Sequence, residues 1–339
     1  GVSFQKEPIH EGIATFKDGK LSKLDLYFYN RGDQGSKSKE KFKKLYNRVA
    51  LNTASLLGTK GKQKGRTRKV SFSWKNKLSK FKLLASSSSK PYRAEFLVLK
   101  VSSSAKKTTK TADTKTLIER KENGDVFLKG VPMVDQGQKG YCVAASISRV
   151  IQFYGRDLGM HEVAKLANTT NDGTSISDAI QAVKRSRGKL KINCKNIRFR
   201  SKTISMAKKL FPAAKNAPEI PFNQYLYARY VLSSSDRSTL LQAIEKKKNL
   251  SKGFLKLIKK SINKGYPIAW TMTYGVYSEG KRPLMQGAAS GHMRLIIGYN
   301  ESKQEIIFSD SWGRGHEFKK CSVAQAYAIT SSLFEISPW

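Results

Sequence analysis

Acidic residues are scarce in this chain of 339 residues, because 25 Asp and Glu stand against 64 Lys and Arg, for a formal net charge of +39. Such an excess predicts attraction to a polyanion: nucleic acid, an anionic membrane surface, an acidic polysaccharide or an acidic protein. The charge does not choose among these partners. The alternative interpretation is a solvated lysine-rich surface that stays in solution by self-repulsion.

Long apolar runs and cysteines are also few. The sequence has no stretch of about 20 apolar residues, so no transmembrane segment is predicted. Its three cysteines cannot all pair; Cys194 and Cys321 are predicted to be buried thiols, with a bridge between them as the alternative. The sequence begins with Gly1 rather than Met, which indicates a processed start and leaves a secreted or cell-surface location open.

The length suffices for two domains. Ser, Thr, Lys and Ala dominate residues 102–115, a composition typical of linkers. We therefore predict an N-terminal accessory domain over residues 1–104, a linker over 105–124 and a second domain over 125–339. The accessory domain is expected to stay attached to the second domain.

The first domain shows a ββαβββ pattern, which predicts a small α+β fold with its helix on one face of a sheet. Strand-like runs at 12–16 and 24–29 flank an Asp-Gly turn, and a helical pattern follows over 36–57 with Gly58 as its stop. Three more strands are predicted at 68–74, 81–84 and 94–101. The glycine-containing basic segment 60–69 is expected to be a mobile solvated loop, with contact to a polyanion as the alternative.

A glycine-rich loop at 135–141 leads into Cys142, which opens a segment with apolar residues at helical spacing that closes at Gly155. Cys142 is therefore predicted at a helix N-terminus. There the backbone N–H groups and the helix dipole favour a thiolate, the nucleophilic form of cysteine. The alternative is a small buried residue without chemistry.

Two β-rich runs, 290–300 and 304–313, read as an antiparallel hairpin. His292 begins the first run and Asp310 ends the second, so antiparallel pairing brings them side by side. Cys142, His292 and Asp310 then form a nucleophile, a base and an orienting carboxylate. Of the other three histidines, His10 belongs to the first domain and His161 is expected to be a surface or capping residue, whereas His316 is a rival base.

At this point the sequence resembles the papain-like cysteine peptidases, and among them the bacteriocin-leader-processing family C-thirty-nine. Gln136 lies six positions before the nucleophile (142 − 136 = 6), and Asp310 precedes Ser311-Trp312-Gly313. The helix predicted after Cys142 ends in Tyr154-Gly155, and the strand predicted after His292 runs to Gly298-Tyr299. The resemblance spans roughly residues 125–339 and is weak between about 190 and 265.

The resemblance implies a bacterial, monomeric enzyme with a helical lobe and a twisted antiparallel sheet, acting on a peptide or protein substrate without metal or cofactor. It implies that Gln136 and the backbone N–H of Cys142 form the oxyanion hole, with Gln138 as a rival donor. The remaining residues assigned to the cleft and its shielding are Trp312, Gly140, Tyr141 and Gly291. Val143 departs from the family pattern, which affects subsite shape. No P-loop pattern is present, so an attached ATP-driven exporter is not expected.

Other elements of the second domain follow from local periodicity. Helices are predicted at 161–167, at 174–185 with Gly188 past its end, at 221–232, at 238–247 and at 254–264. Strands are predicted at 191–198, 266–272, 317–320 and 333–336. The polar loop 277–289 is expected to rim the cleft.

Three functions compete on this evidence. The leading hypothesis is a thiol-dependent peptidase with a Cys-His-Asp triad. A transglutaminase-like acyl transferase would use the same residue order, and a non-catalytic polyanion-binding protein could keep the peptidase fold.

Overall fold

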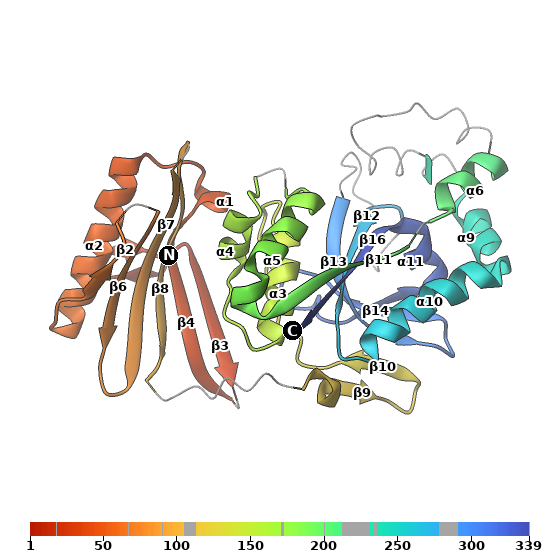
Figure 1. Ribbon diagram of the computed structural model, residues 1–339, viewed down its shortest axis with the longest axis horizontal. Coiled ribbons are helices and arrows are strands. Elements are labelled where there is room, and N and C mark those ends of the chain that lie inside the picture. The colour runs from red at the N-terminus through yellow and green to blue at the C-terminus, as the bar shows by residue number, and fades with distance from the viewer. Residues whose placement is uncertain are drawn as a thin grey trace. The chain divides into compact units, whose positions relative to one another are not determined.

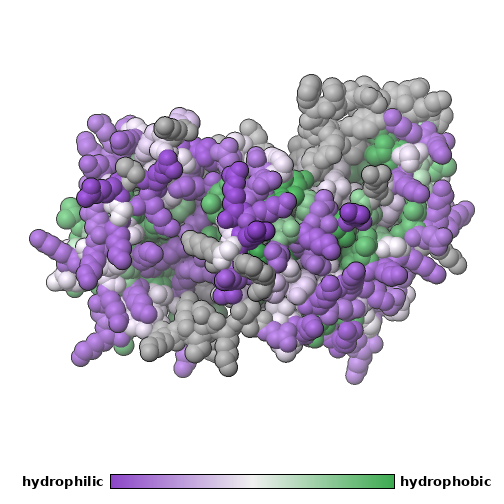
Figure 2. Space-filling model, viewed as in Figure 1, coloured by the Kyte–Doolittle hydropathy of each residue, from purple (hydrophilic) through white to green (hydrophobic). Residues whose placement is uncertain are grey.

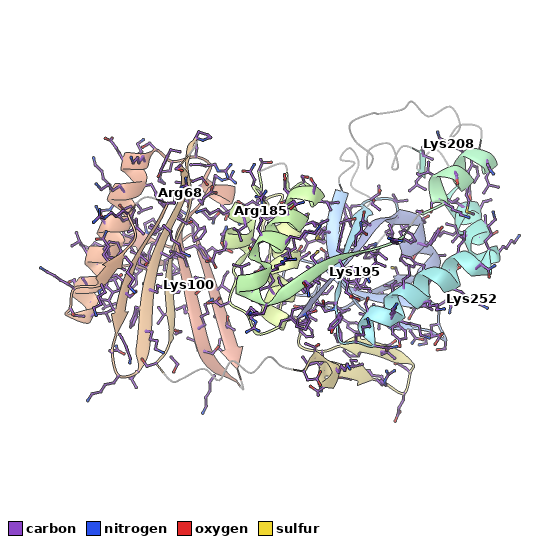
Figure 3. The ribbon with its side chains drawn as sticks, in the orientation of Figure 1. Arg68, Lys100, Arg185, Lys195, Lys208 and Lys252 are labelled. Carbon is purple, nitrogen blue, oxygen red and sulfur yellow. The ribbon has the colours of Figure 1, made fainter. Side chains whose placement is uncertain are left out.

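The computed structural model describes residues 1–17, 19–66, 68–89, 91–104, 113–170, 173–199, 201–211, 231–232, 236–277 and 291–338. It divides into two compact units, Gly1–Thr109 and Lys110–Trp339 (Figure 1). The predicted linker, residues 105–124, spans the boundary between these two units. Arginines and lysines project from both units, as Figure 3 shows for Arg68, Lys100, Arg185 and Lys252.

Unit 1 is built on a six-stranded antiparallel sheet in the order β3-β4-β8-β7-β6-β5. The strands are β3 (Glu11–Lys17), β4 (Lys20–Asn30), β5 (Lys62–Lys64), β6 (Lys69–Lys75), β7 (Ser79–Ser89) and β8 (Tyr92–Ser103). A short hairpin of β1 (Ser3–Phe4) and β2 (Glu7–Pro8) precedes them, and α1 (Arg31–Gln34) and α2 (Lys39–Leu57) lie between β4 and β5. The predicted α+β accessory fold is confirmed.

The helix α2 ends at Leu57, as the sequence predicts, and begins at Lys39, three residues after the predicted start. The Ser38 side chain accepts a hydrogen bond from the backbone N–H of Lys41, and Gly58 closes the helix in the left-handed conformation with φ 62°. Phe42 and Val49 on its inner face join a core with Leu83 and other residues of the sheet. Burying such side chains is the main source of the free energy that holds the helix on the sheet.

Part of the predicted basic loop is a strand. β5 pairs with β6, with Lys62 opposite Ser73 and Lys64 opposite Ser71. Gly61 allows this pairing, because a Cβ there would lie 2.4 Å from the ring of Trp74. The Trp74 indole N–H also donates to the Thr59 carbonyl at 3.2 Å. The edge of the sheet is therefore set by a close approach that composition does not reveal.

Unit 2 contains an eight-stranded sheet with the path β11-β16-β12-β13-β10-β9, from which β14 and β15 continue beside β13. The strands are β9 (Ile118–Arg120), β10 (Asp125–Leu128), β11 (Ile192–Ile197), β12 (Ile268–Thr273), β13 (Gly291–Asn300), β14 (Glu305–Ser309), β15 (Lys319–Ser322) and β16 (Thr330–Pro338). All of the pairs are antiparallel. β9 lies within residues 105–124, so the sheet of unit 2 begins inside the predicted linker.

Helices flank this sheet on two sides (Figure 1). One group is α3 (Cys142–Phe153), α4 (Met160–Leu166) and α5 (Ile176–Leu190), and a second is α6 (Thr203–Leu210), α9 (Arg237–Lys246), α10 (Lys248–Ile262) and α11 (Val323–Ile329). The single-turn η1 (Thr114–Leu117) precedes β9. One continuous apolar core joins both groups to the sheet. A helical group beside a curled antiparallel sheet is the predicted architecture.

Several boundaries differ from the predictions. α5 runs through Gly188 to Leu190, and its left-handed cap is Lys191 with φ 53°; the helix ends there because the next residue starts β11. α11 was not predicted, since a seven-residue apolar stretch fits a strand or a helix equally well. The predicted helix 221–232, except its last two residues, and the predicted loop 277–289, except its first residue, lie outside the described residues. In the described part of the chain, no helix is long and apolar enough to cross a membrane.

Candidate active site

Cys142 is the first residue of α3, as the sequence predicts. The residues of this helix from Cys142 to Ile151 are all buried, so α3 is a central element of the core. One turn after the cysteine, the Ser146 hydroxyl donates to the Met293 carbonyl at 3.2 Å. This bond joins the catalytic helix to β13, the strand that carries His292.

His292 and Asp310 meet at the ends of two neighbouring strands. Antiparallel pairing sets Leu295 opposite Ser309, which brings the start of β13 next to the end of β14. The His292 Nε2 and Asp310 Oδ1 atoms lie 2.7 Å apart. Because Nε2 faces the carboxylate, Nδ1 is the ring nitrogen available to the Cys142 sulfur, with which His292 is hydrogen-bonded.

Asp310 is completely buried and has several partners. Its Oδ1 accepts the Ser311 backbone N–H at 2.8 Å as well as the imidazole. Its Oδ2 lies 2.7 Å from Nε of Arg294, a second buried ion pair. Burial alone would raise the pKa of Asp310, but the charges of His292 and Arg294 hold it well below its usual range. The carboxylate therefore stays ionised.

The cysteine and the histidine shift one another in opposite directions. Burial would raise the pKa of the Cys142 thiol, but the hydrogen bond and charge of His292 lower it below its ordinary value. Burial also opposes the charge of His292, yet Asp310 and Cys142 raise the pKa of its imidazole to about 9. A thiolate beside an imidazolium is the favoured state of this pair.

Arg149, which the sequence analysis did not select, holds the backbone at Asp310. It projects from α3, is fully buried, and donates to the carbonyls of Pro132 and Asp310, each at 2.7 Å, and to the Ser309 hydroxyl. Burial lowers the pKa of Arg149 to about 10, so it remains a cation at neutral pH. A charged residue inside an otherwise apolar helical stripe was the available signal.

Gln136 is linked to the same carboxylate through Ser311. Its side-chain carbonyl accepts the Ser311 hydroxyl at 2.7 Å, and its backbone N–H donates to the Ser311 carbonyl at 2.8 Å. The side-chain amide donates to the Lys139 carbonyl at 3.1 Å. Gln136 is buried whereas Gln138 is exposed. The structure therefore fixes Gln136 in the loop before Cys142.

Trp312 covers the His292 imidazole. The two rings are stacked with centroids 4.9 Å apart and an interplanar angle of 21°. The Arg294 guanidinium lies 5.3 Å from the Trp312 ring, 4.8 Å from that of Phe308 and 5.4 Å from that of Tyr274. The ion pair of Arg294 with Asp310 is thus enclosed by aromatic rings, which exclude water.

The loop that carries Trp312 depends on one glycine. Gly313 has φ 79°, and a Cβ there would lie 2.5 Å from Asp135 Oδ2. This approach brings residues 310–316 against the loop that contains Gln136. The Ser-Trp-Gly motif is therefore a packing requirement as well as a sequence signature.

The other predicted cleft residues occupy different environments. Gly140 is half-buried in the loop before α3, and Gly291 is exposed at the start of β13. Tyr141 is buried, with its ring centroid 5.8 Å from that of His161. The expectation of a surface position for His161 is therefore wrong, because the residue packs inside the helical group. His316 is buried with its ring 5.5 Å from that of Trp312.

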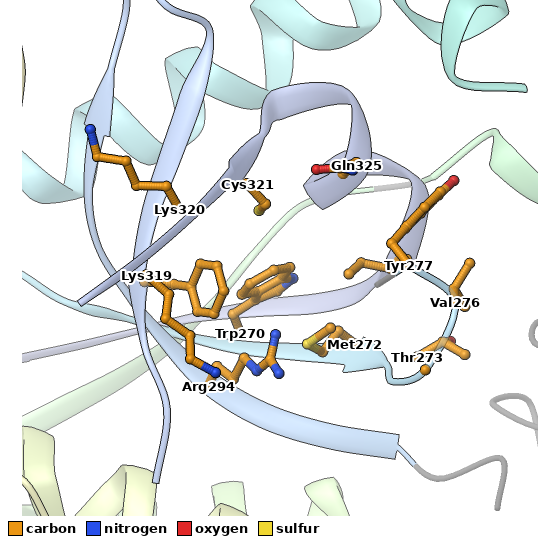
Figure 4. A pocket seen from close by; sticks show the side chains of 13 residues that line it. Trp270, Met272, Thr273, Val276, Tyr277, Arg294, Lys319, Lys320, Cys321 and Gln325 are labelled. Carbon is orange, nitrogen blue, oxygen red and sulfur yellow. The ribbon is translucent and has the colours of Figure 1, made fainter. Parts of the chain in front are cut away.

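A cavity of about 310 Å³ lies on the sheet beside Arg294. Trp270, Met272 and Phe308 form an apolar wall, and Arg294 and Lys319 provide cationic groups at one end (Figure 4). Met272 is the cross-strand partner of His292, and Arg294 is the ion-pair partner of Asp310, so the cavity adjoins these two residues. Cys321 also lines it, while Cys194 lies on β11, and no disulfide joins these two cysteines.

No group of three or more His, Cys, Asp or Glu side chains suited to a metal ion occurs in the described part of the chain. The reactive groups of the site are the Cys142 sulfur, the His292 imidazole and the Asp310 carboxylate. These three groups, with Arg294, carry two negative and two positive charges when the cysteine is ionised. Such a balance is what allows charges to persist in a buried centre.

Comparison with known proteins gives two matching family models. The model described as the peptidase C39 family matches residues 130–241, and the one described as a peptidase C39-like family matches residues 198–333. No curated protein matches the chain.

Two solved structures are similar. One is the peptidase domain of Streptococcus ComA, a bifunctional ABC transporter of a quorum-sensing pathway: 13% identity, 62% of this chain, 99% of that chain and a TM-score of 0.32. The other is xylellain, a cysteine protease from Xylella fastidiosa: 13% identity, 67% of this chain, 89% of that chain and a TM-score of 0.36.

Proposed function

The chain is a C39-like cysteine peptidase, and we propose that Cys142, His292 and Asp310 are the triad with which it hydrolyses peptide bonds. The observation that carries this proposal is the 2.7 Å contact of His292 Nε2 with Asp310 Oδ1, in a buried site where His292 is also hydrogen-bonded to Cys142. The substrate class is a peptide or protein.

In the first step, the Cys142 thiolate attacks the carbonyl carbon of the scissile bond. A carbon–sulfur bond forms, and the electron pair of the carbonyl moves to its oxygen. His292 then gives its proton to the departing amine as the carbon–nitrogen bond breaks, which leaves an acyl-enzyme. Asp310 supports the imidazolium that exists before this transfer.

In the second step, water releases the acid. Neutral His292 accepts a proton from the water as its oxygen attacks the thioester carbon, and the carbon–sulfur bond then breaks to return the thiolate. The imidazolium is restored at the same time. Stacking of Trp312 on the ring fits this exchange, because it keeps bulk water from the contact with Asp310.

The oxyanion of each step requires donors. We assign this role to the Cys142 backbone N–H, at the start of α3, and to the Gln136 side-chain amide. The hydrogen bonds of Gln136 with Lys139 and Ser311 support the assignment, because they fix the amide on a rigid loop before the nucleophile. Each such donor contributes typically ~3 kcal/mol to the transition state.

A thiol-reactive probe tests the proposal without knowledge of the substrate. Iodoacetamide should label Cys142 at neutral pH much faster than Cys194, because burial raises the pKa of the Cys194 thiol to about 11. His292→Ala should slow labelling of Cys142 sharply. The matched control is His161→Ala, which removes a buried histidine outside the site.

Cleavage of an unfolded protein such as casein gives the second readout. Wild type should cut it, and Cys142→Ala should not, whereas Cys321→Ala should retain cleavage. Labelling of Cys142 that is equally slow in wild type and His292→Ala would refute the triad. Transfer of amines to glutamine side chains without cleavage would replace the peptidase by an acyl transferase.

The accessory unit is proposed to remain attached and to contact an anionic partner. Its lysine-rich sheet supports this contact. An increase in activity on cutting the chain near Lys110 would instead indicate an inhibitory pro-region.

A further inference from the structure

Exposed apolar side chains gather at one end of the unit 1 sheet. Phe16 and Leu21 are cross-strand partners beside the β3–β4 turn, and Leu78 lies in the β6–β7 turn. Their exposed fractions are 64%, 53% and 81%. Figure 1 shows both turns at the same, lower end of the sheet. Because β8 alone lies between the β3–β4 and β6–β7 hairpins, the two turns are about three strand spacings apart, or about 15 Å at roughly 4.8 Å per strand.

The β6–β7 turn holds Leu78 outward with an ordered backbone. The Asn76 side chain accepts the N–H groups of Leu78 and Ser79 at 3.0 and 2.6 Å. The Ser104 backbone N–H donates to the Leu78 carbonyl at 2.9 Å, and its hydroxyl donates to the Asn76 carbonyl at 3.0 Å. These hydrogen bonds fix the backbone of the turn. The apolar Leu78 side chain is therefore held in contact with water, which is unfavourable.

Lysines follow directly behind these apolar residues. The sheet register sets Lys23, Ser102, Lys80 and Lys75 opposite one another in a row across four strands. The next row contains Lys100, Lys82 and Lys62. Residues directly opposite one another share a face, so these lysines project from one face of the sheet. The register of β3 with β4 shifts between Thr15 and Phe16, so Phe16 and Leu21 lie at the end of the sheet beyond this shift.

Like charges directly opposite one another destabilise a sheet. Lys75 faces Lys80, and Lys82 faces Lys100. Among the described residues, Lys75, Lys77, Lys80 and Lys82 form no ion pair, whereas Lys23 pairs with Asp25 at 2.7 Å. The surface therefore holds cations that an external anion would compensate. Figure 2 shows hydrophilic residues over most of the visible face, so exposed apolar groups are local features.

We propose that this basic tip, defined as Phe16, Leu21 and Leu78 with Lys20, Lys75, Lys77 and Lys80, binds an anionic phospholipid membrane surface. The apolar side chains enter the interface between headgroups and acyl chains, and the lysines contact the headgroups. Nucleic acid or an acidic polysaccharide would use the lysines alone, so the exposed apolar residues favour the bilayer. The inference is independent of the proposed catalysis in unit 2.

Vesicle sedimentation of the full chain tests the proposal. Wild type should bind phosphatidylcholine vesicles that contain phosphatidylglycerol, and bind pure phosphatidylcholine vesicles far more weakly. Leu78→Ser should weaken binding about tenfold, and Lys75→Gln with Lys77→Gln should weaken it about fivefold per lysine. The matched controls are Leu51→Ser and Lys41→Gln on α2, where Leu51 is 69% exposed; both should bind as wild type does.

A spectroscopic variant reports insertion directly. In Leu78→Trp, the added indole fluorescence should shift to shorter wavelength with anionic vesicles and be quenched by brominated lipid, while Leu51→Trp should show neither effect. The exposed substitutions should leave thermal unfolding unchanged, which separates binding from folding. If the lysine variants lose binding and Leu78→Ser does not, the proposal of membrane binding is overturned and the tip binds a polyanion through its lysines alone. Absence of binding to anionic vesicles would overturn it outright.

Discussion

The proposed active centre of unit 2 and the basic tip of unit 1 differ in whether their charged side chains have partners of opposite charge. In the centre, the Asp310 carboxylate lies between His292 and Arg294, each 2.7 Å away. At the tip, Lys75 and Lys80 lie directly opposite one another on the neighbouring strands β6 and β7. Buried charges must be paired because desolvation is costly, whereas exposed charges are screened by water and salt. The charges of the centre therefore contribute to the stability of the fold, whereas the lysines of the tip remain available to an anionic partner.

Removing the carboxylate should break the centre most severely. We expect Asp310→Asn to lower kcat about 10²- to 10⁴-fold, because the imidazolium loses its orienting anion. The alkaline limb of the activity profile should also move to lower pH, since Asp310 contributes more than Cys142 to raising the pKa of His292 to about 9. A pH–rate profile on casein measures both effects, and an unmoved alkaline limb would contradict the assignment.

The proposed oxyanion donor, Gln136, should give the next largest effect. Gln136→Ala should lower kcat about 10²- to 10³-fold with little change in KM, because the lost bond forms in the transition state. Gln138→Ala is the matched control, since Gln138 is exposed in the same loop. A larger loss in Gln138→Ala than in Gln136→Ala would reassign the donor.

Removing one cation from the centre should reduce stability. Arg294→Met leaves the buried Asp310 without one of its two cationic partners, so unfolding free energy should fall by about 3 kcal/mol. Arg294→Lys should lose less because it retains the charge. Arg314→Met, at an exposed position in the loop that follows Asp310, should stay within about 0.5 kcal/mol of wild type. Denaturant unfolding measures these differences, and equal values for the Met variants would refute the role of the ion pair.

The pH dependence of stability follows from the same centre. The folded-state pKa of His292 lies above its ordinary value of 6.5, so its contribution is complete below pH 6.5 and is lost as pH rises through about 9. The folded-state pKa of Asp310 is depressed from 3.8, so its contribution is present above that pH and is lost on acidification. Between pH 6 and pH 10 the unfolding free energy of wild type should fall. That of His292→Ala should not show this decrease.

Substitutions at the basic tip should change the unfolding free energy least, and should raise it rather than lower it. Lys80→Glu replaces a like-charge pair with an attractive one opposite Lys75, so we expect a gain of about 0.5 kcal/mol that shrinks in high salt. Lys77→Glu, in the turn without a cross-strand partner, should gain less. Thermal unfolding at low and high salt compares them, and destabilisation by Lys80→Glu would contradict the repulsion.

Local patterns predicted the elements that carry the site. Helical spacing after Cys142 indicated α3, and two β-rich runs indicated the hairpin of β13 and β14. The hairpin's antiparallel direction was enough to predict that His292 and Asp310 meet, because both stand at strand ends. The same rules misplaced the end of α5, where tertiary pairing of β11 with β16 begins only after Lys191.

Other features had no local signature. Arg294 is an ordinary cation in the sequence, and the bonds of Gln136 with Ser311 join residues 175 positions apart. His161 was expected near the surface, but helix packing buries it against Tyr141. These contacts depend on which elements pack together, and that cannot be read from the period of a single element.

The sequence by itself determined the order of helices and strands, the excess of positive charge, and a cysteine, histidine and aspartate at the ends of predicted elements. Only the tertiary structure decided which charges are compensated and which are exposed. The physical reason is that periodicity is a property of neighbouring residues, whereas desolvation and ion pairing depend on distances between segments far apart in the chain. Packing enclosed Asp310 between two cations, and sheet register aligned Lys23, Lys80 and Lys75 in one row of the unit 1 sheet.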